Sequence, residues 1–168
     1  MSEFDPKSAK AVHKGNAFED FEVGQVFEHH WGRTFNQGDN SLFTTTTLFF
    51  NPLYFNVEYA RAEGHPDVLI CPMLLLSTVV GLSVEDLSEG GGPFLGVDEL
   101  TFHRPVYPGD TVRARSTVAG HRLSGRRPAF GIVTWHTEAF NQHDVRVLDY
   151  KRSNLIGRRR RAEKGDRR

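Results

Sequence analysis

The sequence predicts an α+β domain in which an antiparallel sheet wraps around one central apolar helix. Between Leu69 and Leu82 almost every residue is apolar, and Pro72 suits the first turn of a helix. Four strand-like runs separated by turn residues follow this segment. A helix that is apolar on nearly all sides must be buried on nearly all sides, so we expect the sheet to enclose it. The 168 residues suffice for a single domain with one core.

The four runs after the helix begin at a Gly90-Gly91-Gly92-Pro93 loop. Alternation of apolar and polar residues predicts a sheet with one buried face. A polar loop is expected over 121–128, between the second and third strands. We expect strands at Phe94–Phe102, Thr111–Val118, Gly131–Phe140 and Val145–Leu155.

The region before the central helix predicts one strand and one short helix. The strand is expected over Gln25–Arg33. Asn36 and Asp39 have the spacing of a capping box, which gives Asp39 a structural role at a helix start. The helix is expected to end at Asn51-Pro52, because proline disfavours helical backbone at the preceding residue.

Charge and composition predict where the domain begins and ends, and which partners are expected. We expect a flexible arm over 1–17, the domain over 18–156, and a basic disordered tail over 157–168. The tail lacks aromatic residues for base stacking, which favours a solvated end over a nucleic-acid arm. The formal net charge of zero likewise gives no reason to expect nucleic acid as a partner.

Other features indicate a cytoplasmic protein without a resident cofactor. Cys71 is the single cysteine, so no internal disulfide can form. The N-terminus is too polar for a signal peptide, and the longest apolar stretch is shorter than the roughly 20 residues of a membrane helix. The eight histidines lack zinc-ligand spacing, and the glycine run at Gly90 lacks the Gly-Lys-Ser/Thr of a P-loop.

Several motifs, in order along the chain, resemble the MaoC-like hydratases. Similarity to their subgroup acting on mesaconyl-CoA and itaconyl-CoA is found at 32–34 and 39–45. Asn51-Pro-Leu-Tyr54 stands where the family has Asn-Pro-Leu-His. The matching segments are Phe18–Gly24, Gly32–Thr34, Asp39–Thr45, Asn51–Tyr54, Phe102–Thr111, Gly131–Thr134 and Asn141–Gln142.

The resemblance implies a hot-dog fold and an acyl-thioester substrate. It implies a homodimer, or a heterodimer with a related hot-dog chain, that binds an acyl-CoA or acyl-carrier-protein thioester in a tunnel between subunits. Coenzyme A would enter only as part of the substrate. In the family an Asp and a His five residues apart activate water and protonate the α carbon. A backbone amide at the start of the central helix binds the thioester carbonyl.

This chain departs from the family at each of these positions. Phe49 and Tyr54 occupy the Asp and His positions, and Phe49 cannot move a proton. Tyrosine, with a reference pKa near ~10, is a donor and a poor base at neutral pH. Pro72 replaces the glycine that would offer an amide hydrogen.

Candidate replacements are few. Tyr54, Asn51 and His65 are the catalytic candidates, although an Asn before proline suits a turn and a loop histidine suits exposure. Phe49 and the amides of Cys71 and Met73 are the substrate-binding candidates near the central helix. Arg126 and Arg127 are candidates for the phosphates of coenzyme A, with a solvated loop as the simpler interpretation.

Three functions stay open on these residues. One is a hydratase or dehydratase with a non-standard site around Tyr54. The second is a non-catalytic subunit that binds an acyl thioester. The third is a pocket adapted to isomerisation, cyclisation or thioester hydrolysis, because one fold hosts many reactions.

Overall fold

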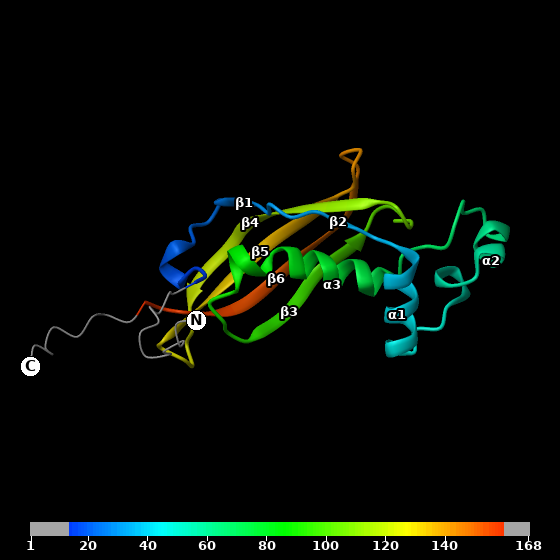
Figure 1. The fold of residues 1–168 in the computed structure, drawn as a ribbon. Helices are drawn as coiled ribbons and strands as arrows, with labels where there is room; N and C mark the ends of the chain where they lie inside the picture. The colour runs from blue at the N-terminus through cyan, green and yellow to red at the C-terminus, as the bar shows by residue number, and fades with distance from the viewer. Residues whose placement is uncertain (1–13, 160–168) are drawn as a thin grey trace, which may run out of the picture.

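In the computed structural model, which describes residues 14–159, a long helix lies across the inner face of a curved antiparallel sheet (Figure 1). The strand order is β1-β4-β5-β6-β3, and the short β2 pairs with β4 outside this path. All pairings are antiparallel. The strands are β1 (Val26–Glu28), β2 (Arg33–Thr34), β3 (Phe94–Phe102), β4 (Thr111–Leu123), β5 (Phe130–Phe140) and β6 (Arg146–Gly157). The predicted α+β fold with a central helix is confirmed.

The inner face of the sheet carries the core because burial alternates along each central strand. In β5, every second residue from Gly131 to Ala139 is buried, as the two-residue period of a strand requires. One core cluster gathers Phe35, Leu75 and Val79 against the ends of β4, β5 and β6. A second gathers Phe18, Phe21 and Leu87 around Trp135 at the other end of the sheet.

The helices divide into a central pair and an outlying group. The central helix α3 (Pro72–Leu82) continues into the short α4 (Val84–Leu87). The outlying group consists of α1 (Gln37–Thr47), the 3-10 turn η3 (Pro52–Tyr54) and α2 (Val57–Ala62), which lie beyond the N-terminal end of α3 (Figure 1). A further 3-10 turn, η2 (Phe18–Asp20), lies at the opposite end of the sheet.

Several predicted boundaries are wrong. The strand expected over Gln25–Arg33 is broken into β1 and β2, with His29 between them turned into the interior. The first helix ends at Leu48 and not at Asn51-Pro52, because Leu48 takes a left-handed conformation with a φ of 56°. Strand β4 continues to Leu123 through a register shift at 118–120, which shortens the loop expected over 121–128.

The expectation that α3 is buried on nearly all sides holds on one side only in a single copy. Leu75 and Val79 are buried against the sheet. Leu74, Leu76 and Val80, on the flanks of the helix, are only partly buried. These apolar side chains of α3 are therefore not fully covered by residues 14–159 of one copy.

The predicted ends of the domain can be checked only in part. The arm expected over 1–17 and the tail expected over 157–168 lie mostly outside the described residues. At 157–159, however, the chain is held in place. Gly157 ends β6, the Arg159 amide donates to Glu19 at 2.9 Å, and Arg158 pairs with Glu19 at 3.2 Å. Within the described part of the chain, no helix is long and apolar enough to cross a membrane.

Candidate functional site

Asn40 ties together the three segments that meet at the N-terminal end of α3. This side chain on α1 is fully buried. Its amide nitrogen donates to the carbonyl oxygens of Tyr54 and Leu69 at 2.7 and 2.8 Å. Its oxygen accepts from the backbone amide of Cys71 at 2.8 Å. The position of Tyr54 relative to the start of α3 is therefore fixed by one residue.

Phe49 and Tyr54 lie against each other beside this junction. Their ring centroids are 5.9 Å apart, and Tyr54 is buried whereas Phe49 is 40% exposed. Burial, with a smaller effect of the neighbouring Cys71, raises the pKa of the Tyr54 hydroxyl. Tyr54 therefore keeps its proton at neutral pH, so its hydroxyl can donate a hydrogen bond.

The first turn of α3 offers fewer amides than the sequence suggested. The Cys71 amide donates to Asn40, so it is not free to bind a substrate in this structure. Pro72 has no amide hydrogen. Met73 is the next residue, and its amide belongs to the first turn, where helical amides have no partner within the helix. This leaves the Met73 amide as the candidate donor.

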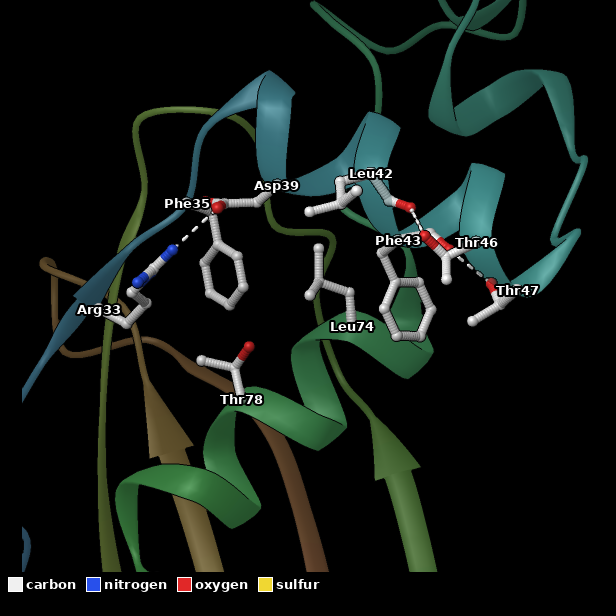
Figure 2. A pocket seen from close by; sticks show the side chains of 9 residues that line it. All are labelled: Arg33, Phe35, Asp39, Leu42, Phe43, Thr46, Thr47, Leu74 and Thr78. Carbon is white, nitrogen blue, oxygen red and sulfur yellow. Dashed lines mark hydrogen bonds and ion pairs between the residues drawn. The ribbon is translucent and has the colours of Figure 1, made fainter.

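A hollow of about 290 Å³ lies between α1 and α3 (Figure 2). We call it the α1 hollow. Its floor is apolar, with Phe35, Phe43 and Leu74 directed into it (Figure 2). Its rim carries an ion pair of Arg33 and Asp39 with an N–O distance of 2.8 Å. Asp39 also completes the predicted capping box, which is confirmed, so its carboxylate is fully engaged in structure.

A second hollow, of about 280 Å³, lies on the other side of the α3 N-terminus. We call it the β3 hollow, because the end of β3 forms one wall. Pro72 and Leu75 of α3 form another wall. Three basic side chains line it, namely His65, His103 and Arg104, and no carboxylate does. The β3 hollow is therefore an apolar space whose lining includes the cation Arg104.

A family model described as mesaconyl-CoA hydratase matches residues 5–167 of the sequence. The chain belongs to this family. A mesaconyl-CoA hydratase of Haloarcula marismortui is 39% identical over 147 residues, which are 87% of this chain and 41% of the relative. The chain thus spans less than half the length of such curated relatives.

Solved structures agree with the family assignment. A MaoC domain protein dehydratase from Chloroflexus aurantiacus superposes with a TM-score of 0.84 at 32% identity, covering 90% of this chain and 43% of that one. Rv0216 from Mycobacterium tuberculosis, described as a double hot-dog fold, superposes with a TM-score of 0.76 at 25% identity, covering 90% of this chain and 47% of that one. The predicted hot-dog fold and the resemblance to MaoC-like hydratases are confirmed.

The structure gathers some of the predicted site residues and separates others. Phe49 packs on Tyr54, Cys71 lies near Tyr54, Met73 follows in the first turn of α3, and His65 lines the β3 hollow. Asn51 caps η3 by accepting from the Leu53 amide at 3.1 Å, as a turn residue does. Arg126 and Arg127 are exposed in the loop after β4, at the end of the sheet opposite α1 (Figure 1). In one copy they do not line either hollow.

Sequence reasoning missed Asn40, His103 and Asp149. Asn40 carries no motif beyond its place within the family-like segment 39–45, and its role depends on contacts 14 to 31 residues away. His103 lies inside the segment Phe102–Thr111, which was used only to recognise the fold. Asp149 joins it from β6, 46 residues further along. Among residues 14–159, no group of three His, Cys, Asp or Glu side chains has the arrangement of a metal site.

Proposed function

We propose that this chain is a hydratase or dehydratase subunit that acts on an enoyl or 3-hydroxyacyl thioester of coenzyme A or of a carrier protein. The observation that carries the proposal is the match of 5–167 to the mesaconyl-CoA hydratase family. Coenzyme A would be present only as part of the substrate. The single buried cysteine, Cys71, fits a reducing compartment such as the cytoplasm.

The donors at the start of α3 support this reaction class. Addition of water to an enoyl thioester develops negative charge on the thioester oxygen, which fixed donors stabilise. The protonated Tyr54 hydroxyl and the Met73 amide are the donors available here. The positive end of the α3 dipole favours the same charge. Phe49 supplies apolar contact at the position where the family carries its acid.

The proposal includes a second hot-dog unit, supplied by another copy of this chain or by a related chain. Relatives such as the Haloarcula protein are more than twice as long as the matched region, and one similar structure is described as a double hot-dog. The partly buried α3 residues Leu74, Leu76 and Val80 leave some apolar surface uncovered within residues 14–159. Edge strand β3 adds exposed Phe94, Leu95 and Phe102. Light scattering at several concentrations would test for a homodimer, and a monomer throughout would contradict it and leave the related chain as the second unit.

A second candidate function follows from Phe49 and Pro72. Phe49 cannot move a proton at the position where the family has Asp, and Pro72 cannot donate an amide hydrogen where the family has glycine. On this alternative the chain binds an acyl thioester without turning it over. A positioned acid or base contributes about 10²–10⁴ to the rate of the reaction, and a subunit without them lacks this acceleration. A pocket adapted to isomerisation, cyclisation or thioester hydrolysis is the remaining alternative.

One panel separates these functions. The purified protein is mixed with crotonyl-CoA, mesaconyl-CoA and butyryl-CoA, and both loss of the conjugated double bond and release of free thiol are followed. The hydratase proposal expects loss of the double bond without free thiol, and a drop in kcat of about tenfold or more in Tyr54→Phe. Tyr59→Phe, on the exposed surface of α2, is the matched control and should keep full activity.

Each other result has a definite meaning. Tight binding without turnover would overturn the hydratase proposal in favour of the binding subunit. Free thiol without hydration would indicate hydrolysis. Full activity of Tyr54→Phe would leave a hydratase but remove Tyr54 from its mechanism.

A further inference from the structure

Arg152 on β6 is a buried cation that pairs with no carboxylate among residues 14–159. It is only 1% exposed. Nε and Nη2 of its guanidinium are buried and have no hydrogen-bond partner in this part of the chain. Burial lowers the pKa of the group, although an arginine keeps its proton in proteins. Because a buried charge is costly without an opposite charge, an anion is the partner that would stabilise it.

The strand register explains why Arg152 points into the core. It lies directly opposite Trp135 of β5, and both side chains are on the buried face of the sheet. The guanidinium carbon of Arg152 lies 5.2 Å from the centroid of the Trp135 six-atom or indole ring system. The face of an aromatic ring attracts a cation, but the contact leaves Nε and Nη2 without an acceptor. Trp135 therefore compensates part of the charge and none of these hydrogen bonds.

The buried side chains around Arg152 are mainly donors. Nε1 of Trp135, which can only donate, has no hydrogen-bond partner among residues 14–159. The Tyr150 hydroxyl lies near those of Ser83 and Thr137 but makes no hydrogen bond of good geometry. Burial raises the pKa of Tyr150, so its phenol keeps a proton to donate.

Asn154 adds the one acceptor without a partner in this group. Its buried Oδ1 has no donor among residues 14–159. The two ends of an asparagine amide have nearly the same shape, so half a turn would present the two N–H groups of Nδ2 instead. The donors thus outnumber the acceptors, which is the composition of an anion site and not of a cation site.

These side chains are close enough to contact one small ion. Alternate residues on one face of a strand are about 7 Å apart, and side chains directly opposite on neighbouring strands have Cβ atoms about 5 Å apart. Tyr150, Arg152 and Asn154 alternate along β6, and Trp135 faces Arg152 from β5. Tyr150 belongs to the first core cluster and Trp135 to the second. The group, which we call the Arg152 site, therefore lies between the two clusters.

The carboxylates of the neighbouring strands are not available to this site. Asp149 and Glu138 lie on the opposite face of the sheet, because successive side chains of a strand alternate. Each is held there by two basic side chains. Asp86 of α4 is bound to His29 at 2.6 Å.

We propose that the Arg152 site binds a small inorganic anion from the solvent, of the size of chloride. Nε and Nη2 of Arg152 donate to the anion, with Nε1 of Trp135 and the Tyr150 hydroxyl as further donors. A monatomic ion suits a close-packed core, which has no room for a large organic anion. The anion neutralises Arg152 and joins the two core clusters. This site is independent of the hydratase function proposed above.

Urea unfolding at fixed chain concentration tests the site with sodium chloride as the probe. Chloride replaces gluconate at constant ionic strength, because gluconate is too large for the site. A ligand that binds only the folded state lowers the equilibrium constant for unfolding in proportion to its concentration once this exceeds Kd. We expect a fall of about tenfold for each tenfold rise in chloride in that range.

Two neighbouring residues of β6 give a matched pair of variants. Arg152→Met should abolish the dependence on chloride. In gluconate it should be at least as stable as the wild type, because an apolar side chain replaces an uncompensated charge. Lys151→Met is the control, since Lys151 pairs with Glu99 at 2.7 Å on the opposite face. It should keep the full dependence on chloride.

A second measurement covers the case in which Arg152→Met does not fold. Crystals of the wild type grown with sodium bromide should show anomalous scattering from an ion within hydrogen-bond distance of the Arg152 guanidinium. Bromide found only elsewhere would overturn the proposal.

The unfolding data have two outcomes of the same kind. Equal stability of the wild type in chloride and gluconate would overturn the anion site and leave a carboxylate outside residues 14–159 as the partner of Arg152. Equal dependence on chloride in Arg152→Met and Lys151→Met would mean a general salt effect, which would overturn the site as well.

Discussion

Two histidine–aspartate pairs, one beside edge strand β1 and one beside edge strand β3, differ in what their second nitrogen contacts. His29 binds Asp86 through Nδ1 at 2.6 Å and Ser116 through Nε2 at 2.9 Å, and its side chain is fully buried. Ser116 continues to Thr137 at 2.8 Å. His103 binds Asp149 through Nε2, and its Nδ1 has no hydrogen-bond partner among residues 14–159. The first pair belongs to a closed chain of hydrogen bonds, and the second has an open end.

The comparison shows that an Asp–His–Ser series is no evidence of catalysis by itself. In His29 both nitrogens are satisfied, and Ser116 is wholly buried, so no substrate can reach its hydroxyl. Buried polar groups of this kind stabilise and specify a core when each has its partner. At His103, by contrast, the partner carboxylate is shared with His136 and is partly exposed.

The largest expected effect on stability comes from breaking the closed pair. His29→Ala leaves a cavity and removes partners from Asp86 and Ser116, so the free energy of unfolding should fall by about 3 kcal/mol. Urea unfolding at fixed chain concentration measures it. His143→Ala, in the exposed turn before β6, is the control and should change the value by less than about 0.5 kcal/mol. A loss below about 1 kcal/mol for His29→Ala would mean that water replaces the ring.

A smaller and pH-dependent effect is expected at the open pair. Asp149→Asn weakens two hydrogen bonds and should lower the free energy of unfolding by about 1–2 kcal/mol at neutral pH. The folded pKa of Asp149 lies below its usual range. Its stabilising contribution is therefore complete above the unfolded value near ~4 and disappears as the pH falls through the folded value.

Urea unfolding of the wild type and Asp149→Asn across this range tests the sign. The difference between the two proteins should shrink as the pH falls below about pH 4. A difference that grows below about pH 4 would contradict the assignment of an ionised Asp149 as the acceptor.

The smallest effect is expected at the loop after β4. The double variant Arg126→Ala with Arg127→Ala removes two exposed side chains at the far end of the sheet from α1. Its free energy of unfolding should change by less than about 0.5 kcal/mol, and KM for crotonyl-CoA should stay within about twofold. A tenfold rise in KM would instead restore the role in phosphate binding that the sequence suggested.

The fold was predictable because its signals are local and repeated. Each of these signals lies within a few neighbouring residues. They are the apolar run Leu69–Leu82, the alternating strands, and the capping box of Asn36 and Asp39. The helix end at Leu48 was not predictable, because a leucine rarely takes a left-handed conformation and no neighbouring residue indicates one. The break between β1 and β2 depends on His29 finding Asp86, 57 residues away.

The candidate site was predictable only where the family motif pointed. Tyr54 and Phe49 stand at recognisable positions, and their proximity follows from the motif spacing. The loss of the Cys71 amide was not foreseeable, because Asn40 reaches it across 31 residues. Pairing of His103 with Asp149 likewise arises from the register of β3 on β6.

The three hydrogen bonds of Asn40 have a consequence for the exchange of backbone hydrogens with solvent. One buried amide group joins α1 to η3 and to the first residue before α3. The backbone hydrogen of Cys71 can exchange with solvent only when its hydrogen bond to the Asn40 side chain breaks. We expect the hydrogen bond from Asn40 to the Tyr54 carbonyl to break in the same opening. Cys71 should thus exchange slowly and in step with its neighbours in η3. Asn40→Ala should accelerate them together, so that one amide reports how often this end of the molecule opens.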